Sequence, residues 1–301
     1  MGEFVQNPSA DVFRHGRIPE GKDGETMGLA NMRELLIQAE AGGYAVGSFS
    51  VANMECIQGV IRAAESCQAP VILQIAEVRL GHSPLYLIGP MMLAAARAAK
   101  VPVAVHLDHG MTVACVKEAL ALGFTSVMCD GSHLPLEDNI SLTREVVALA
   151  RGTGAAVEAE VGRVGRNEDG SAAEEQIASL DDCLAMDATG IDALAVGIGN
   201  AHGLYAVTPN LRYEVLEQTH GRIAASLVLH GGSGLTDEQF RRVIQLGMRK
   251  INIATDIFRA QAGACAGSDI FRNIEASSEA VCAVVSRYIK LFGSEGKADA
   301  S

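Results

Sequence analysis

The sequence contains no hydrophobic run long enough to cross a membrane. A membrane-spanning helix needs about 20 consecutive apolar residues, and the longest apolar segment, residues 91–105, is interrupted by Arg97, Lys100 and Pro102. The first residues also lack the apolar core of a secretory signal. We therefore expect a cytoplasmic protein without a membrane partner.

Basic residues are scarce in this chain. It has 24 Lys and Arg against 36 Asp and Glu, for a net charge of −12. An acidic surface repels nucleic acid and anionic membranes, so we expect neither as a partner. Any anionic substrate would have to be held by local hydrogen-bond donors.

Paired cysteine motifs are absent as well. None of the seven cysteines forms a C-x-x-C pair, and residues such as Cys115, Cys129 and Cys282 have hydrophobic neighbours in the sequence. Buried, reduced thiols in a cytosolic protein are the expected state.

The chain itself, at 301 residues and 49% hydrophobic, can bury a large core. Residues 1–27 are polar and show no periodicity, so we interpret them as a flexible extension or a cloning remnant. Residues 28–301 are expected to form one domain, in which short apolar segments alternate with helical ones. The expected strands are residues 44–49, 70–76, 101–108, 126–130, 155–160, 193–198, 225–230 and 250–254.

The helix signals support this alternation. Thr236 and Gln239 form a capping box, helices are expected to start at Ser83-Pro84 and Thr208-Pro209, and a final helix is expected over residues 279–291. Eight strand–helix units indicate a (β/α)8 TIM barrel with an extra C-terminal helix. A doubly wound sheet is the alternative fold, although its G-x-G-x-x-G turn is absent after the first strand.

Polar residues are expected at the carboxyl ends of the strands, where this fold places its chemistry, and rarely elsewhere in a strand. His109, His202 and His230 follow strands three, six and seven. Three imidazoles with an open position are typical of a catalytic zinc site. His106, three residues before His109, is expected to point the other way and to be structural. Lys250 begins the eighth expected strand, so we place it at the opposite rim.

Carboxylates accompany these histidines. Asp130 and Glu160 either orient the imidazole rings or offer an oxygen ligand, and Glu160 could instead pair with a barrel arginine. Asp108, directly before His109, suits general acid–base chemistry, or it is another orienting carboxylate. Glu168 lies in a polar loop and is a candidate for a second proton carrier.

Two loops have the character of a phosphate site. His230-Gly231-Gly232-Ser233-Gly234 follows strand seven, and the segment 252–256 ends strand eight and opens a helix. Loops after strands seven and eight, next to a helix N-terminus, commonly bind phosphate in this fold. A G-G-S-G sequence alone is equally compatible with a flexible turn.

The ordered motifs resemble those of the class II (zinc-dependent) ketose-bisphosphate aldolases over residues 27–297. The matching motifs are Gly47-Ser48-Phe49-Ser50-Val51-Ala52-Asn53-Met54-Glu55, His106-Leu107-Asp108-His109-Gly110, Ser126-Val127-Met128-Cys129-Asp130-Gly131-Ser132-His133-Leu134-Pro135, Val157-Glu158-Ala159-Glu160-Val161-Gly162, Ala201-His202-Gly203-Leu204-Tyr205, the strand-seven loop and the segment 252–256.

The resemblance implies reversible retro-aldol cleavage of a tagatose- or fructose-type ketose 1,6-bisphosphate. The products would be dihydroxyacetone phosphate and glyceraldehyde 3-phosphate. It implies Zn²⁺ on the three histidines, a hydroxyl proton handled by Asp108, and a carbon-bound proton handled by Glu168. The residues implied to touch the substrate or its phosphate are Asn53, Gly203, Gly231, Ser233, Asn252, Ala254 and Thr255. A monovalent cation (Na⁺ or K⁺) and a homodimer or homotetramer are also implied.

Departures from the family pattern concern the far end of the substrate. Ala254 and Ala206 are of the tagatose type, whereas Phe258 and Ala76 replace a basic residue and a serine that commonly meet the second phosphate. A ketose 1-phosphate with a different aldehyde half is therefore the alternative substrate. A metallohydrolase or a non-catalytic barrel subunit is less favoured. Such hydrolases commonly have an H-x-H pair after strand one, and here the residues are Ser48-Phe49-Ser50.

Overall fold

The computed structural model describes residues 28–165 and 175–298, so the expectations for 1–27 and for Glu168 fall outside the described residues. Within these ranges, eight parallel strands follow one another around a closed barrel, which confirms the predicted TIM barrel. The strands are β1 (Val46–Ser50), β2 (Val71–Ala76), β3 (Val103–Gly110), β4 (Ser126–Cys129), β5 (Ala156–Val161), β6 (Ala193–Val196), β7 (Ser226–Leu229) and β8 (Met248–Ile253).

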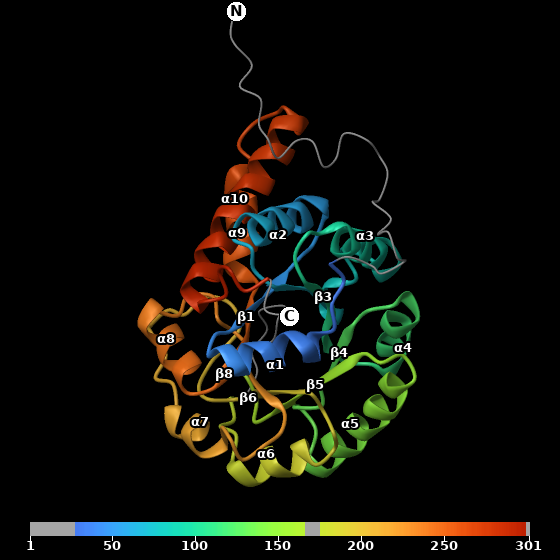
Figure 1. Ribbon diagram of the computed structural model, residues 1–301, viewed down its shortest axis with the longest axis vertical. Helices are drawn as coiled ribbons and strands as arrows, with labels where there is room; N and C mark the ends of the chain where they lie inside the picture. Colours follow the sequence, from blue (N-terminus) through green and yellow to red (C-terminus); the bar gives the residue numbers. More distant parts are fainter. Residues whose placement is uncertain (1–27, 166–174, 299–301) are drawn as a thin grey trace, which may run out of the picture.

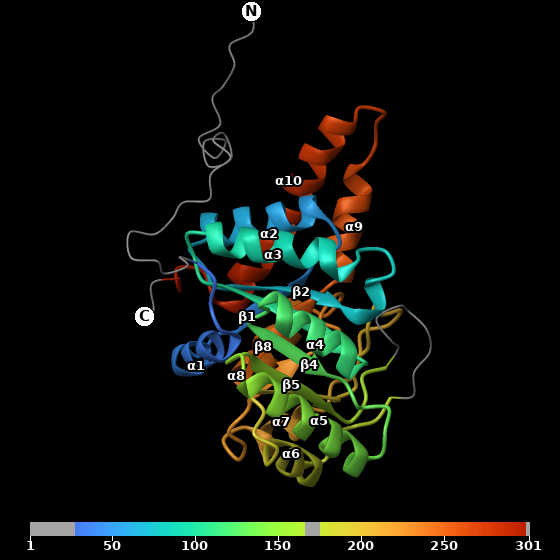
Figure 2. The same cartoon turned by 90° about the vertical axis from the view of Figure 1, so that its right-hand side faces the viewer.

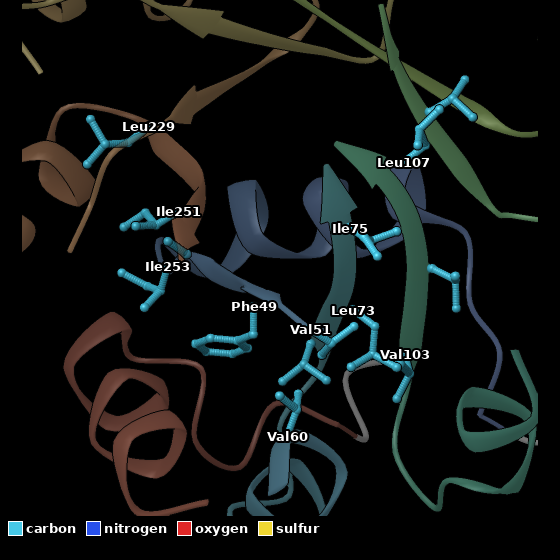
Figure 3. Packing of buried hydrophobic residues seen from close by; sticks show 14 of the residues in the cluster. Phe49, Val51, Val60, Leu73, Ile75, Val103, Leu107, Leu229, Ile251 and Ile253 are labelled. Atoms are coloured by element: carbon cyan, nitrogen blue, oxygen red, sulfur yellow. The ribbon is translucent and has the colours of Figure 1, made fainter. Parts of the chain in front are cut away.

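Helices surround the barrel in Figure 1. They are α1 (Met32–Gly42), α2 (Met54–Ser66), α3 (Leu85–Ala98), α4 (Val113–Leu122), α5 (Leu136–Arg151), α6 (Leu180–Asp187), α7 (Tyr213–Thr219), α8 (Asp237–Gln245), α9 (Thr255–Ala264) and α10 (Ile270–Phe292). No described helix is both long and apolar enough to cross a bilayer. Outward-facing strand residues such as Phe49, Leu73 and Ile251 belong to the main core cluster, shown in Figure 3.

Helix α1 closes the amino-terminal end of the barrel. Its apolar residues Met32, Leu35 and Leu36 pack in one cluster with inward-facing strand residues such as Val46 and Ile72. Figure 1 shows α1 lying across the centre of the barrel. Because this end is filled by side chains, chemistry is left to the opposite end, where the carboxyl ends of the strands meet.

The helix predictions had mixed outcomes. The capping box of Thr236 and Gln239 is confirmed at the start of α8. The start at Thr208-Pro209 is wrong, because α7 begins only at Tyr213. The C-terminal helix is confirmed, but α10 starts earlier than expected, at Ile270 after the N-cap Asp269. Figure 2 shows α9 and α10 side by side, reaching beyond the barrel.

Candidate active site

The structure brings the three predicted histidines together at the carboxyl end of the barrel. His109 is the next-to-last residue of β3, and His202 and His230 follow β6 and β7. The ring centroids of His109 lie 4.9 Å from His202 and 4.6 Å from His230. One nitrogen from each ring lies within 4.8 Å of the others, and all three residues are buried.

His109 enters this group through an irregularity in β3. Side chains alternate between the two faces of a strand. The three-residue spacing of His106 and His109 therefore predicted opposite directions for their side chains, and this prediction is wrong. The β3–β4 ladder shifts register between Leu107 and Gly110, and His109 has a positive φ of 41°. Both histidines therefore face the inside of the barrel, where His106 Nδ1 lies 2.9 Å from Ser126 Oγ.

Carboxylates fix how two of the rings present their nitrogens. His109 Nδ1 lies 2.6 Å from Asp130 Oδ2, and His230 Nε2 lies 2.8 Å from Glu158 Oε1. An ionised carboxylate can only accept a hydrogen bond, so these contacts assign the N–H groups to His109 Nδ1 and His230 Nε2.

The opposite nitrogens, His109 Nε2 and His230 Nδ1, then face each other at 3.0 Å. At this distance, either a proton carried by one of the two nitrogens or a cation bound by both must lie between them. Two nitrogens bound to one tetrahedral zinc ion are about 3.3 Å apart. Glu160 Oε2 lies 3.5 Å from His230 Nδ1 and has no hydrogen-bond partner among the described residues. The donor set therefore fits a divalent cation.

The charges around the rings shift their proton affinities in opposite directions. Burial alone would lower the pKa of His109, but the Asp108 charge and the Asp130 hydrogen bond raise it well above its usual range. Burial and the neighbouring charges of His109 and Lys250 hold the pKa of His230 well below its usual range. These causes favour the neutral ring, which is the form in which an imidazole can bind a metal.

The two accompanying carboxylates also differ. Burial alone would raise the pKa of Asp130, but the hydrogen bond from His109 holds it well below its usual range. Burial and the nearby Asp130 charge raise the pKa of Glu160 to about 8. Glu160 accepts the Val164 N–H at 3.2 Å, and within the described ranges its Oε2 lies 3.5 Å from His230 Nδ1 rather than next to an arginine.

Asp108 is completely buried and held by two amide groups. Gln74 Nε2 donates to Asp108 Oδ2 at 3.0 Å, and Asn252 Nδ2 donates to Asp108 Oδ1 at 3.1 Å. Ser48 donates to the Gln74 carbonyl oxygen, which orients that amide. Sequence reasoning missed Gln74, although a glutamine inside an apolar strand was a visible signal.

A polar layer inside the barrel contradicts the expectation that polar residues stay at the strand ends. Gln74, His106, Glu158 and Lys250 lie within strands and are all fully buried. The placement of Lys250 at the opposite rim is wrong, because β8 begins two residues earlier, at Met248. Lys250 Nζ reaches Asn252 Oδ1 at 2.7 Å and Glu158 Oε2 at 2.9 Å.

The predicted phosphate residues line a small pocket beside the histidines. The lining residues are His202, Gly203, Gly231, Gly232, Ser233, Asn252, Ala254 and Thr255. Helix α9 begins at Thr255, so its free N–H groups and positive dipole end suit an anion. Gly231 has φ of 63°, and a Cβ there would lie 2.3 Å from the Ala201 carbonyl oxygen. Glycine is therefore required at this close approach.

Asn53 and Tyr205 have roles that the sequence did not indicate. Asn53 is exposed and caps α2, where its Oδ1 accepts the Cys56 N–H at 3.1 Å. It is absent from the residues that line the pocket. The Tyr205 hydroxyl accepts the Ala201 N–H and donates to the Gly231 carbonyl, both at 2.8 Å. Tyr205 thereby ties together the loops that carry His202 and His230.

A closed barrel with three convergent histidines at its carboxyl end is the architecture of a metal-dependent enzyme. Residues 30–297 match the family model described as fructose-bisphosphate aldolase class-II. The chain belongs to this family, whose members are metal-dependent lyases. Membership of this family confirms the predicted resemblance. It decides against the metallohydrolase and the non-catalytic barrel subunit.

Individual relatives are similar over their full lengths. A 6-phospho-5-dehydro-2-deoxy-D-gluconate aldolase of Halalkalibacterium halodurans is 42% identical over 285 residues, covering 90% of this chain and 99% of the relative. A fructose-bisphosphate aldolase of Streptococcus pneumoniae is 38% identical over 296 residues, covering 90% and 100%. The crystal structure of the YdjI aldolase from Escherichia coli K12 has a TM-score of 0.82 and 34% identity, covering 90% and 100%.

Proposed function

We propose that this chain is a zinc-dependent aldolase that reversibly cleaves a ketose phosphate into dihydroxyacetone phosphate and an aldehyde. The observation that carries the proposal is the pair of imidazole nitrogens, His109 Nε2 and His230 Nδ1, facing each other at 3.0 Å next to Asp108. His109, His202 and His230 would hold the zinc ion. Bound there, zinc would supply Lewis-acid polarisation of the ketone oxygen.

Asp108 would act as the base for cleavage. It would take the proton from the substrate hydroxyl on C4, whose O–H electrons form the aldehyde carbonyl as the C3–C4 bond breaks. The electron pair of that bond stays with the three-carbon half, which regains a proton at C3. Glu168 is proposed for that second proton transfer. In the reverse direction, Asp108 returns its proton to the new hydroxyl.

The remaining site residues would bind and orient. Asp130 and Glu160 would orient the ligand histidines by hydrogen bonding and charge. The pocket at the start of α9 would hold the phosphate of the three-carbon half, with a monovalent cation (Na⁺ or K⁺) beside it. The residues proposed for substrate and phosphate contact are Gly203, Gly231, Ser233, Asn252, Ala254 and Thr255, with Asn53 at the margin of the site.

The substrate proposed first is a tagatose- or fructose-type ketose 1,6-bisphosphate, giving glyceraldehyde 3-phosphate as the aldehyde. A second candidate has a carboxylated aldehyde half, as the name of the 42% identical relative describes. Ala76 supports the second candidate, because it pairs with Asp108 in the β2–β3 ladder and has no hydroxyl group to hold a second phosphate. Half-buried Phe258 packs against the core and offers no charge there.

The proposal extends to the whole protein. We propose that residues 28–301 act as one aldolase barrel, while the expectation for residues 1–27 lies outside the described residues. A homodimer or homotetramer in the cytoplasm is part of the same proposal. The relatives named above are aldolases that match this chain over nearly their entire length, which supports a catalytic barrel.

One assay tests this function. Zinc-loaded protein is incubated with fructose and tagatose 1,6-bisphosphates and with 6-phospho-5-dehydro-2-deoxy-D-gluconate, and release of dihydroxyacetone phosphate is measured. We expect release from one of them, its loss with a chelator, and its recovery with zinc. Asp108→Ala should retain zinc and lose cleavage, whereas His109→Ala should lose both. Cleavage that is insensitive to chelators would refute the proposal.

A further inference from the structure

A buried ion pair beneath the three histidines has no role in the mechanism above. Lys250 on β8 and Glu158 on β5 are both 0% exposed, and Lys250 Nζ lies 2.9 Å from Glu158 Oε2. Replacing such a pair by apolar side chains is often neutral or stabilising, because burying two charges is costly. Neighbouring inward-facing positions such as Ile72 and Val228 are apolar, and Val228 is the direct partner of Lys250 in the β7–β8 ladder. Stability therefore does not explain the pair.

The first consequence of Lys250 concerns the amide of Asn252. Lys250 Nζ donates to Asn252 Oδ1 at 2.7 Å. An ammonium group only donates hydrogen bonds, so the amide must turn its oxygen toward it. The NH₂ group of Asn252 then faces Asp108 Oδ1 at 3.1 Å. With the amide reversed, two donors would face each other and a carbonyl oxygen would face the Asp108 carboxylate.

The second consequence concerns the ring of His230. Lys250 holds one oxygen of Glu158, and the other oxygen, Oε1, lies 2.8 Å from His230 Nε2. The Glu158 carboxylate thereby accepts the Nε2 proton of His230. The Nδ1 lone pair of His230 is left pointing toward His109 Nε2, where the zinc ion is proposed.

We propose that Lys250 is a positioning residue that sets two orientations with one ammonium group. Through Asn252 it directs an amide donor at Asp108, and through Glu158 it fixes the His230 tautomer that presents Nδ1 to the metal. Lys250 itself touches neither the substrate nor the metal. The inference rests on the proposed aldolase function, since it assigns Asp108 and His230 the roles given there.

Lys250→Met tests the inference, because methionine has similar length without charge or donors. At saturating zinc we expect kcat for cleavage to fall about 10–100-fold, with KM unchanged within about threefold. Zinc affinity, measured in the absence of substrate by competition with a chelator, should fall about tenfold or more. A folded Lys250→Met protein with unchanged kcat or unchanged zinc affinity would overturn the inference.

Arg249→Met is the matched control. Arg249 is the preceding residue on β8, is also buried, and pairs with Glu40 at 2.8 Å. Within the described ranges, Glu40 also contacts His220 and none of the three histidines of the candidate site. We expect this variant to lose stability but to keep kcat and zinc affinity. Equal kinetic losses in both variants would mean that Lys250 acts only through stability, which contradicts the inference.

A double-mutant cycle tests whether Lys250 affects catalysis through Asn252 or independently of it. At saturating zinc, where the route through Glu158 and His230 is compensated, Lys250 is inferred to affect kcat through Asn252. Adding Lys250→Met to Asn252→Ala should then lower kcat further by less than about threefold. Multiplying losses would overturn that step.

Two further outcomes are an unfolded Lys250→Met variant and a wild-type protein without activity. If Lys250→Met does not fold, Glu158→Gln must still lower zinc affinity about tenfold, and unchanged affinity overturns the inference. A wild type that binds zinc but cleaves no ketose phosphate refutes the proposed function. The zinc affinities of Lys250→Met and Arg249→Met would then decide the inference.

Discussion

Asp130 shows how the hydrogen bonds around the histidines should control metal affinity. Its Oδ2 accepts the His109 Nδ1–H at 2.6 Å, and its Oδ1 accepts the Ser132 backbone N–H at 3.1 Å. Asparagine has nearly the same shape but only one acceptor oxygen. In Asp130→Asn, an NH₂ group must therefore face a donor on either His109 or Ser132.

The size of the effect follows from the lost bond. A buried hydrogen bond to a charged group contributes about 1.5–3 kcal/mol. Since each 1.4 kcal/mol corresponds to a factor of ten in an equilibrium constant, zinc should bind Asp130→Asn about 10–150-fold more weakly. Removing a partner that orients a metal-bound histidine typically has an effect of similar size.

Zinc dissociation constants of the metal-free wild type and variant, measured by chelator competition, test this expectation. Asp192→Asn is the control, because Asp192 is also an ion-paired carboxylate but binds Arg33 and the Val157 N–H, away from the histidines. The control should lose stability and keep its zinc affinity. Equal zinc affinity of Asp130→Asn and wild type, within about threefold, would refute the reasoning.

Three further predictions concern other parts of the barrel. Gly231→Ala should raise KM for the ketose phosphate by about tenfold or more, because the added Cβ would collide with the Ala201 carbonyl oxygen. Gly43→Ala is the control and should keep KM, because Gly43 has a similar φ of 64° but open space around it. Equal KM values in the two variants would contradict this prediction. Leu36→Ala should lower the free energy of unfolding in urea by about 2–5 kcal/mol, because Leu36 is buried in the helix that closes the barrel; a loss below about 1 kcal/mol would contradict the packing described. In native thiol titration at mildly alkaline pH, exposed Cys265 should react quickly. Burial raises the pKa of Cys56 to about 11, so Cys56 should react only on unfolding or as the pH rises toward that value, and fast reaction at mild pH would count against its burial.

Much of the barrel could be predicted because strands covered on both faces appear as short apolar runs. The eight expected strands overlap the observed ones, and the residues at their carboxyl ends, including His202 and His230, meet as the barrel geometry requires. Local helix signals were reliable where side chains bond to nearby backbone, as at Thr236. They failed at Thr208, where a proline after a capping residue does not by itself start a helix.

The inside of the barrel was harder to predict, because small shifts in register reverse the direction of a side chain. The bulge at His109 turns that ring inward, which alternation along the strand could not show. A two-residue error at the start of β8 misplaced Lys250, which lies inside the barrel and contacts Asn252. The capping role of Asn53 depends on where α2 begins, and the sequence did not define that boundary.

The most direct test of the central claim is a crystal structure of zinc-soaked protein with anomalous data collected at the zinc edge. We expect one anomalous peak for a zinc ion that is bonded to His109 Nε2, His230 Nδ1 and a nitrogen of His202, each at about 2.0–2.1 Å. A zinc ion held by Asp130 and Glu160 without His202, or no zinc peak between the three rings, would contradict it.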